Sequence, residues 1–309
     1  MSISAPSAAP TPPIAGAPVT LAAALLRTAR PRQWIKNGAV LAAPAAAGVL
    51  GTGATAGRLA CAFGCLCAVA SGTYLLNDAA DAERDRRHPV KRLRPVAAGD
   101  LPRAVAVLAG TGLMAAGLLA SWLTIGAAFL ATVAGYVVLT VAYTLWLKHV
   151  PVIELATVAA AYILRAAAGG VAAGVPLSRW FLIVVSFGAL FLVAGKRYSE
   201  YVTLGDHRGH TRETLDSYTA SYLRFVWSMA ATVSVAAYCL WAFREPAQMA
   251  APWPTLTIVP FVLGVLRYAL ILDSGGGAAP EELILGDRTL KLIVGAWIAL
   301  FAAGLILGS

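Results

Sequence analysis

The chain has 309 residues, of which 59% are hydrophobic and only 13% are charged, and its mean hydropathy is +0.73. In soluble domains, about a quarter of the residues are charged. This composition excludes a soluble globular protein, a disordered chain, a collagen-like fibre and a disulfide scaffold. It predicts an all-α, polytopic membrane protein. Because charge is costly near a bilayer, the positions of the few charged residues carry functional information.

In chain order, a tail precedes the expected membrane domain. Residues 1–18 are rich in Pro, Ala and Ser and carry no charge, which predicts disorder, and residues 19–309 are expected to form a single domain. The stretch 19–36 is amphipathic and is expected to lie in the membrane interface. A spanning helix needs about 20 mostly apolar residues. Nine runs are candidate spans: 38–53, 58–77, 104–121, 123–147, 152–174, 180–198, 219–243, 254–273 and 289–308. Pro44 interrupts the first of them.

The basic residues gather on one side of this expected topology. Two long polar loops, 78–103 and 196–218, fall on the same side of a nine-span chain. With that side in the cytoplasm, 19 of the 24 Lys and Arg residues face the cytoplasm, as the positive-inside rule requires. We therefore interpret the net charge of +9 as a topology signal combined with phosphate binding, and not as a nucleic-acid surface. A multi-pass protein with cytoplasmic polar loops is expected.

The first polar loop opens with an acidic helical face. At about 100° per helical residue, Asn77, Asp78, Asp81 and Asp85 lie within about 100° of one another, whereas Glu83 points away. Carboxylates on one face repel one another unless a cation lies between them. Oxygen ligands suit Mg²⁺, with Mn²⁺ as an alternative, and Mg²⁺ often bridges to substrate phosphates. The competing interpretation is a solvated helix end neutralised by arginines. We expect a metal site at these four residues, with the three aspartates as the catalytic carboxylates.

Basic residues follow this acidic face. Lys91 and Arg94 belong to HisProValLysArgLeuArgPro, 88–95, where the prolines favour an extended or turning backbone. Cations beside a metal ion suit a bound diphosphate, because the metal neutralises part of the charge and Lys or Arg the rest. The alternative is that these residues only set the topology.

The second polar loop starts with GlyLysArgTyrSerGluTyr, 195–201. Lys196 and Arg197 are expected at the membrane surface, where they could bind phosphate. Glu200 follows Lys196 by four residues, so an ion pair within one helix is the plain alternative.

Arg165 is the most unusual charged residue because it lies within an expected span. A buried arginine implies a partner or a water-filled cavity. The candidate partners are Asn77, Asp78, Glu154 and an anionic substrate. A structural ion pair and a substrate contact explain Arg165 equally well.

These motifs resemble a known family. AsnAspxxAspxxxAsp (77–85) and HisProxLysxxArgPro (88–95) resemble the UbiA superfamily of intramembrane prenyltransferases, and the resemblance covers about residues 19–309. It implies a UbiA-like bundle of about nine helices. Common members transfer a prenyl group from a prenyl diphosphate to an aromatic acceptor and carry a second aspartate-rich motif. This chain has LysArgTyrSerGluTyr in that place, and the usual TyrxxxLys is stretched to Tyr143 and Lys148.

Further motifs resemble one actinobacterial branch of this superfamily. They are ArgProArgGlnTrpIleLysAsn (30–37), ValAlaGlyLysArgTyrSerGlu (193–200) and SerTyrxxxTyrLeuArgPheValTrp (217–227). In that branch the donor is phosphoribosyl diphosphate and the acceptor is a polyprenyl phosphate. The resemblance implies a glycosyltransferase of the bacterial plasma membrane, trimeric, whose product decaprenylphosphoryl-5-phosphoribose feeds arabinan synthesis for the cell wall.

The expected mechanism distributes roles over the polar residues. Donor phosphates are assigned to Lys91, Arg94, Lys196, Arg197 and Tyr198. The lipid phosphate is assigned to Gln33, Lys36 and Arg165, and further site residues are Tyr143, Lys148 and Glu200. Two alternatives remain: an aromatic-acceptor prenyltransferase, which requires a second acidic cluster, and a transporter of a phosphorylated solute, which predicts internal repeats.

Overall fold

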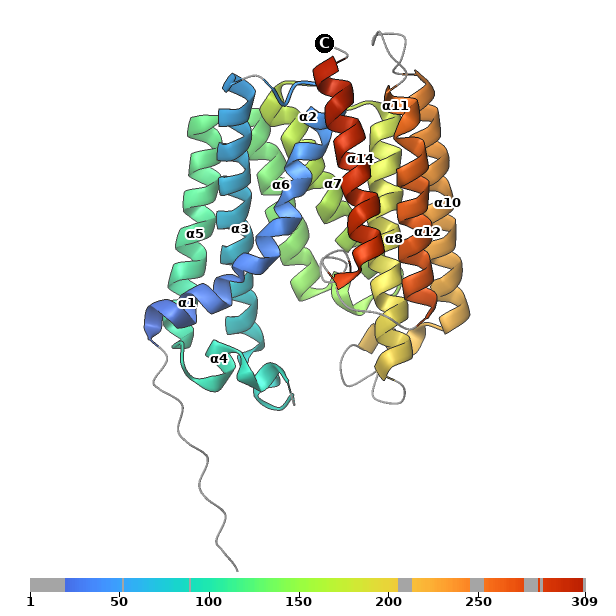
Figure 1. The fold of residues 1–309 in the computed structure, drawn as a ribbon. Helices are drawn as coiled ribbons and strands as arrows, with labels where there is room; N and C mark the ends of the chain where they lie inside the picture. Colours follow the sequence, from blue (N-terminus) through green and yellow to red (C-terminus); the bar gives the residue numbers. More distant parts are fainter. Residues whose placement is uncertain are drawn as a thin grey trace, which may run out of the picture.

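The computed structural model describes residues 20–51, 53–88, 90–204, 213–244, 253–274, 283 and 286–307. The expected disordered tail, 1–18, lies outside the described residues, as does the middle of the second polar loop, 205–212. All regular structure in the described part is helical, which confirms the expected fold class (Figure 1).

Seven helical segments among the described residues are long and apolar enough to cross a membrane. They are α3 (Gly53–Arg86), α5 (Arg103–Thr124), α6 (Ala127–Leu145), α7 (Ile153–Ala173), α8 (Arg179–Leu204), α10 (Ala220–Arg244) and the pair α11 (Trp253–Leu256) and α12 (Ile258–Asp273). They correspond to the second through eighth expected spans. The ninth, 289–308, corresponds to α14 (Arg288–Leu307). An apolar run of about 20 residues predicts such helices well, because the thickness of the bilayer's hydrocarbon core sets the length of the run.

The first expected span, 38–53, is wrong as a continuous helix. The chain instead forms α1 (Leu21–Ala29), the 3₁₀ helix η1 (Pro31–Leu41) and the short α2 (Ala42–Ala46). Arg30 adopts a left-handed conformation with φ of 55° and ends α1, and Pro31 begins the next piece. Together the three pieces rise obliquely from the end of the molecule near α4 (Pro95–Ala98) to the end where α3 begins (Figure 1).

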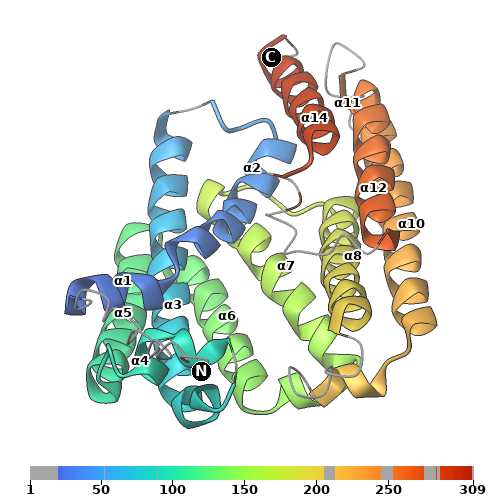
Figure 2. The ribbon, with the colours of Figure 1, turned by 60° about the horizontal axis from the view of Figure 1, so that its bottom comes forward.

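Helix α7 occupies the centre of the bundle. It packs against α3 and α6 on one side and against α8 on the other (Figure 2). The broken segment also lies on α7, and Gly169 makes this close approach possible. A Cβ atom at Gly169 would overlap the carbonyl oxygen of Val40, so only glycine fits there. The contact fixes the depth of η1, which carries Lys36 and Asn37.

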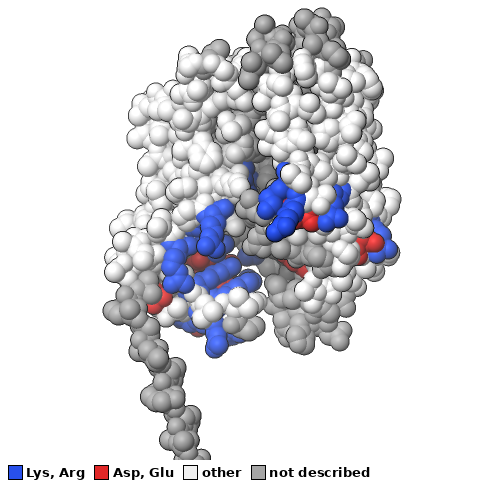
Figure 3. Space-filling model, viewed as in Figure 1, with Lys and Arg blue, Asp and Glu red and all other residues white. Residues whose placement is uncertain are grey.

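The two ends of the molecule differ in charge. On the face drawn in Figure 3, Lys, Arg, Asp and Glu side chains gather toward the end where α1 and α4 lie, and the other described residues on that face are uncharged. The polar end is built from extensions of the spans, because α3 continues through Arg86 and α8 through Leu204. The expected polar loops are therefore partly helical at their beginnings.

Candidate active site

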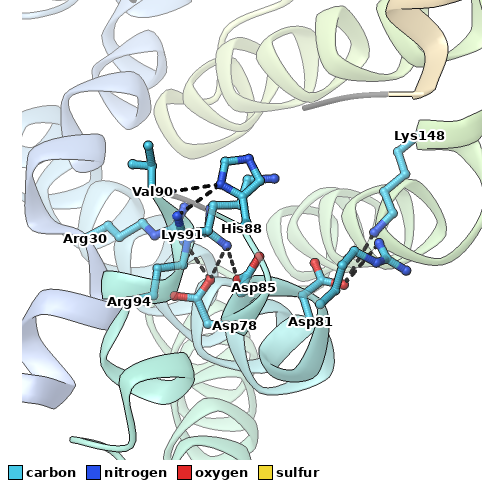
Figure 4. A network of polar contacts seen from close by, with 10 residues as sticks. Arg30, Asp78, Asp81, Asp85, His88, Val90, Lys91, Arg94 and Lys148 are labelled. Atoms are coloured by element: carbon cyan, nitrogen blue, oxygen red, sulfur yellow. Dashed lines mark hydrogen bonds and ion pairs between the residues drawn. The ribbon is translucent and has the colours of Figure 1, made fainter. Parts of the chain in front are cut away.

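The acidic motif lies on the last turns of α3 at the polar end. The Asp78 and Asp85 carboxylates are both buried, at 2% and 3% relative exposure. Arg94 bridges them, with its Nη1 at 3.2 Å from Asp78 Oδ1 and 2.7 Å from Asp85 Oδ2 (Figure 4). Arg30 contributes a second guanidinium at 2.6 Å from Asp78. Charge-assisted hydrogen bonds from the two arginines offset the free-energy cost of removing these carboxylates from water.

Asp81 lies apart from the other two carboxylates and faces different cations. Its Oδ1 is 3.8 Å from Lys148 Nζ and 3.7 Å from Arg84 Nη1, and Figure 4 shows it on the other side of the helix end. Lys148 belongs to η3 (Leu147–His149), which follows α6. About a quarter of the Asp81 side chain is exposed. The expected common face is thus divided between an arginine-bound pair and one accessible aspartate.

This division limits how a metal ion could be held. Among the described residues no three His, Cys, Asp or Glu side chains form a group close enough to bind a metal, so the expected convergence of three carboxylates is not observed. Mg²⁺ is often held by only one or two carboxylates together with water and substrate phosphates. Asp81, with the Asn77 amide on the preceding turn, fits that smaller donor set. Asp78 and Asp85 could bind the ion only after losing their present contacts with arginine side chains.

The basic segment after α3 is folded over the acidic pair. Residues Lys91–Leu93 form the short η2, and Arg94 leads into α4. The Nδ1 atom of His88 accepts hydrogen bonds from the backbone N–H groups of Val90 and Lys91, both at 3.2 Å. The turn therefore directs Arg94 toward the aspartates, and Lys91 lies nearby at the same end (Figure 4).

A cavity of about 200 Å³ lies deeper between α3, α6 and α7. Its polar lining includes Lys36, Asn77, Tyr143 and Arg165, and the described residues that line it include no Asp or Glu. Gln33, half-buried at the start of η1, is not among the lining residues. The cavity therefore brings together two cations, from η1 and α7, and connects them to the acidic motif through Asn77.

Arg165 is buried and is held by uncharged partners. Its Nε donates to Asn37 Oδ1 at 2.9 Å, its Nη1 to the Ala161 carbonyl at 3.1 Å and its Nη2 to the Tyr136 hydroxyl at 2.7 Å. Its guanidinium also lies 4.6 Å from the Tyr136 ring centroid and 5.4 Å from that of Tyr162. Of the partners expected from sequence, neither Asn77, Asp78 nor Glu154 forms a bond with Arg165 in the described part of the chain. Its positive charge has no carboxylate partner there.

Glu154 pairs with Arg197 instead. The Glu154 carboxylate is fully buried and accepts bonds from Arg197 Nε at 2.9 Å and Nη2 at 3.0 Å. Glu200 accepts a third bond from Arg197 at 3.0 Å. Arg197, which the sequence assigns to donor phosphate, is 5% exposed here and joins α7 to α8.

The neighbours of Arg197 are also used within the bundle. Tyr198 is buried, and its hydroxyl accepts a hydrogen bond from Arg224 at 2.7 Å. The hydroxyl is therefore used within the bundle and is not presented to a donor in the region around Asp81. Lys196 lies 4.0 Å from Glu200, the ion pair that the four-residue spacing allowed, and 40% of its side chain remains exposed. Of the three donor-phosphate candidates on α8, Lys196 alone is accessible.

Several residues of the site are not apparent from sequence spacing. Arg30, Asn37 and Tyr136 reach the site from elements far from their partners in sequence. The signal that pointed to them was indirect: a charged residue inside an apolar run requires partners, which are then found on the helices that pack against it.

Comparison with known proteins agrees with this architecture. Residues 38–293 match the UbiA prenyltransferase family, and the chain belongs to that family. The similar proteins named decaprenyl-phosphate phosphoribosyltransferase include relatives from three bacterial species. The one from Mycolicibacterium smegmatis is 44% identical, with 95% of this chain and 96% of the relative covered. The relative from Corynebacterium glutamicum is 45% identical, with 91% of this chain and 86% of the relative covered. The relative from Mycobacterium tuberculosis H37Rv is 43% identical, with 94% of this chain and 97% of the relative covered.

Solved structures show the same fold at low sequence identity. A UbiA homolog from Archaeoglobus fulgidus, bound to GPP and Mg²⁺, superimposes with a TM-score of 0.68 at 18% identity, covering 91% of this chain and 99% of that one. A digeranylgeranylglyceryl phosphate synthase superimposes with a TM-score of 0.63 at 16% identity, covering 92% and 98%. The expected UbiA-like bundle is confirmed.

Proposed function

We propose that the chain transfers the 5-phosphoribosyl group of phosphoribosyl diphosphate to a polyprenyl phosphate. With decaprenyl phosphate as acceptor, the products are diphosphate and decaprenylphosphoryl-5-phosphoribose, a precursor for arabinan of the cell wall. The name and close similarity of the relatives support this assignment. The structural observation that carries it is a cavity between spanning helices that is lined by two cations and, among the described residues, no carboxylate.

The donor diphosphate is assigned to the polar end of the cavity. Asp81 and Asn77 would hold Mg²⁺, or Mn²⁺ in its place. Asp85 would become a further ligand after release of Arg94, and Asp78 after release of both Arg94 and Arg30. When bound, the ion supplies charge neutralisation for the diphosphate. Lys148 and Arg84 already lie within 4 Å of Asp81, so this edge carries cations for the phosphates as well. Lys91, Arg94 and the exposed Lys196 are the other donor-phosphate candidates.

The acceptor phosphate is assigned to Lys36 and Arg165. A guanidinium has five N–H donors, and three of those of Arg165 are used by uncharged partners. The two remaining N–H groups make no hydrogen bond within the described part of the chain, which suits two oxygens of a phosphate. Lys36 lines the same cavity. Arg165 belongs to the spanning helix α7, so it is placed where a substrate with a lipid chain can reach it.

The reaction follows from these two placements. An acceptor phosphate oxygen forms a bond to C1 of the ribose while the bond from C1 to the diphosphate oxygen breaks. The electron pair leaves with the diphosphate, whose charge the cations at the Asp81 end stabilise. A phosphate monoester is already anionic at neutral pH, so no side chain has to remove a proton. Attack from the face opposite the diphosphate inverts the configuration at C1.

The membrane arrangement is part of the same proposal. The polar end, with its concentration of Lys and Arg, faces the cytoplasm of a bacterial plasma membrane, where a soluble phosphorylated donor is available. Membrane lipids cover the apolar flanks, and three protomers assemble into a trimer, as the family resemblance implies.

The proposal is tested with the purified full chain in lipid vesicles. The substrates are phosphoribosyl diphosphate labelled in the ribose, Mg²⁺ and decaprenyl phosphate. We expect label in the organic phase in proportion to diphosphate released, and no transfer without Mg²⁺. Prenyl transfer to an aromatic acid, without phosphoribosyl transfer, would overturn the proposal in favour of an aromatic prenyltransferase. Label that enters sealed vesicles without forming lipid would identify a transporter.

A further inference from the structure

The connection between η3 and α7 contains a strained turn. The Ile153 N–H donates to the Pro151 carbonyl at 2.8 Å, which makes Pro151, Val152 and Ile153 a γ-turn. Its central residue, Val152, has φ of 67° and ψ of −49°. The γ-turn with positive φ is the rarer and more strained form, and a β-branched residue is disfavoured there. Such a backbone persists only when the surrounding structure holds it.

Two contacts hold this turn. The Val152 N–H donates to the Tyr218 hydroxyl at 2.7 Å. Two residues later, Glu154 is clamped by Arg197 of α8. Burial raises the pKa of Tyr218 to about 12, so its hydroxyl stays protonated at physiological pH and remains a neutral acceptor for Val152. Tyr218 is itself 4% exposed and directly follows η5 (Glu213–Ser217), which lies against η3.

The turn begins three residues after Lys148, whose ammonium lies 3.8 Å from Asp81. We propose that the Tyr218–Val152 hydrogen bond is a positioning contact that holds the strained turn and, through it, Lys148 against Asp81. This inference rests on the proposed function for its effect on turnover. It assigns a purpose to the SerTyrxxxTyrLeuArgPheValTrp motif, because the motif couples the second polar loop to the acidic end of α3.

A double-mutant cycle separates positioning from general stability. Tyr218→Phe removes the acceptor hydroxyl and is expected to lower kcat/KM about five- to tenfold, the effect of one lost hydrogen bond. In a Lys148→Gln background, the same change is expected to alter kcat/KM less than about twofold, since the group it positions is already gone. An equal fall in both backgrounds would show that Tyr218 does not act through Lys148 and would overturn the inference.

A rescue variant tests the strain itself. Glycine accepts a positive φ without steric cost, so Val152→Gly is expected to return the Tyr218→Phe enzyme to within about twofold of wild type. No recovery in the double variant would overturn the role assigned to the turn. Tyr222→Phe is the matched control: Tyr222 stacks on Tyr218 in the same motif, and its hydroxyl makes no hydrogen bond within the described residues. It is expected to retain wild-type activity.

A measurement that does not depend on turnover completes the test. The full chain is treated with an acetylating reagent, and the rates of Lys148 and Lys196 modification are followed by mass spectrometry. Lys148 is 19% exposed and is expected to react several-fold faster in Tyr218→Phe, with Lys196 as the unchanged reference. Faster labelling without any phosphoribosyl transfer by wild type would refute the proposed function and support the contact. Equal labelling rates would overturn the inference whatever the activity.

Discussion

Arg165 donates its Nε–H to the side-chain oxygen of Asn37 at 2.9 Å, across 128 residues of sequence. The bond ties α7 to the broken first segment of the bundle. It also fixes a guanidinium in the wall of the cavity without cancelling its charge. A buried cation stabilised only by dipoles and aromatic rings is suited to an anionic ligand.

Loss of the Arg165 guanidinium is expected to impair acceptor use selectively. Arg165→Lys keeps a positive charge but loses the planar guanidinium with its several N–H donors. The change removes a hydrogen bond to phosphate worth about 1.5–3 kcal/mol. The expected result is a KM for polyprenyl phosphate raised about tenfold to a hundredfold, with the KM for the donor little changed. Steady-state kinetics with each substrate varied in turn provide the measurement. Arg58→Lys is the control, because Arg58 donates to the Ala172 carbonyl and neither residue lines the cavity. A rise in donor KM alone would contradict the acceptor assignment.

Asp81 is expected to be essential for metal-dependent turnover. Asp81→Asn removes the accessible carboxylate and should lower kcat by about two orders of magnitude. A loss of this size is a part of the several kcal/mol by which a bound metal ion stabilises charge in the transition state. The half-saturating Mg²⁺ concentration should rise as well, which a metal titration of the reaction measures. Glu83→Gln is the matched control, since Glu83 lies on the exposed face of the same helix and pairs with Arg86. Normal Mg²⁺-dependent turnover by Asp81→Asn would refute the metal assignment.

The Glu154–Arg197 pair is expected to determine stability. Arg197→Met leaves the fully buried Glu154 carboxylate without its main partner, at a cost of about 3–5 kcal/mol. Combining Arg197→Met with Glu154→Leu should recover most of that loss, because no buried charge then remains. Lys196→Met, which affects an exposed pair, should change stability by less than about 1 kcal/mol. Thermal unfolding in one detergent compares the four proteins, and a stability of Arg197→Met equal to wild type would contradict the structural role.

The start of α14 is expected to depend on pH. Asp287 accepts bonds from Arg267 at 2.7 Å and from the Leu290 N–H at 2.6 Å. The hydrogen bond from Arg267, and then those from the α14 backbone, hold the pKa of Asp287 below its usual value. The stabilisation is therefore complete above about pH 4 and is lost as the pH falls through the lowered pKa. The protection factor for hydrogen exchange in the first turn of α14 should fall in that acidic range. An Asp287→Asn variant that showed the same acid transition would disprove this origin.

The apolar runs predicted the spanning helices well, because span length is a local property of sequence. The first expected span, 38–53, was mispredicted as one continuous helix, because it contains Pro44 and is divided between the end of η1 and the short α2. Helical periodicity correctly placed Asp78 and Asp85 together, and it could not separate Asp81 from them. That separation depends on Arg94 and Lys148, which approach from other elements.

Long-range pairing explains why two neighbouring basic residues differ in exposure. Arg197 and Lys196 are adjacent in sequence and look equivalent, yet Arg197 faces Glu154 on a neighbouring helix and Lys196 faces outward. Spacing within one helix defines a face but does not say which helix covers it. The presence of Glu154 at the start of an apolar run was the available clue, since a buried carboxylate requires a cation.

The salt bridges of Arg30 and Arg94 have a thermodynamic consequence for the order of ligand binding. Any metal ion that reaches Asp78 or Asp85 competes with guanidinium groups that already neutralise those carboxylates. A donor phosphate that draws Arg94 away removes that competition at Asp85 and reduces it at Asp78, where Arg30 remains, and so strengthens metal binding. Linkage is reciprocal, so the ion must strengthen donor binding by the same factor. The donor and the ion are therefore expected to enter together, and neither to bind tightly alone.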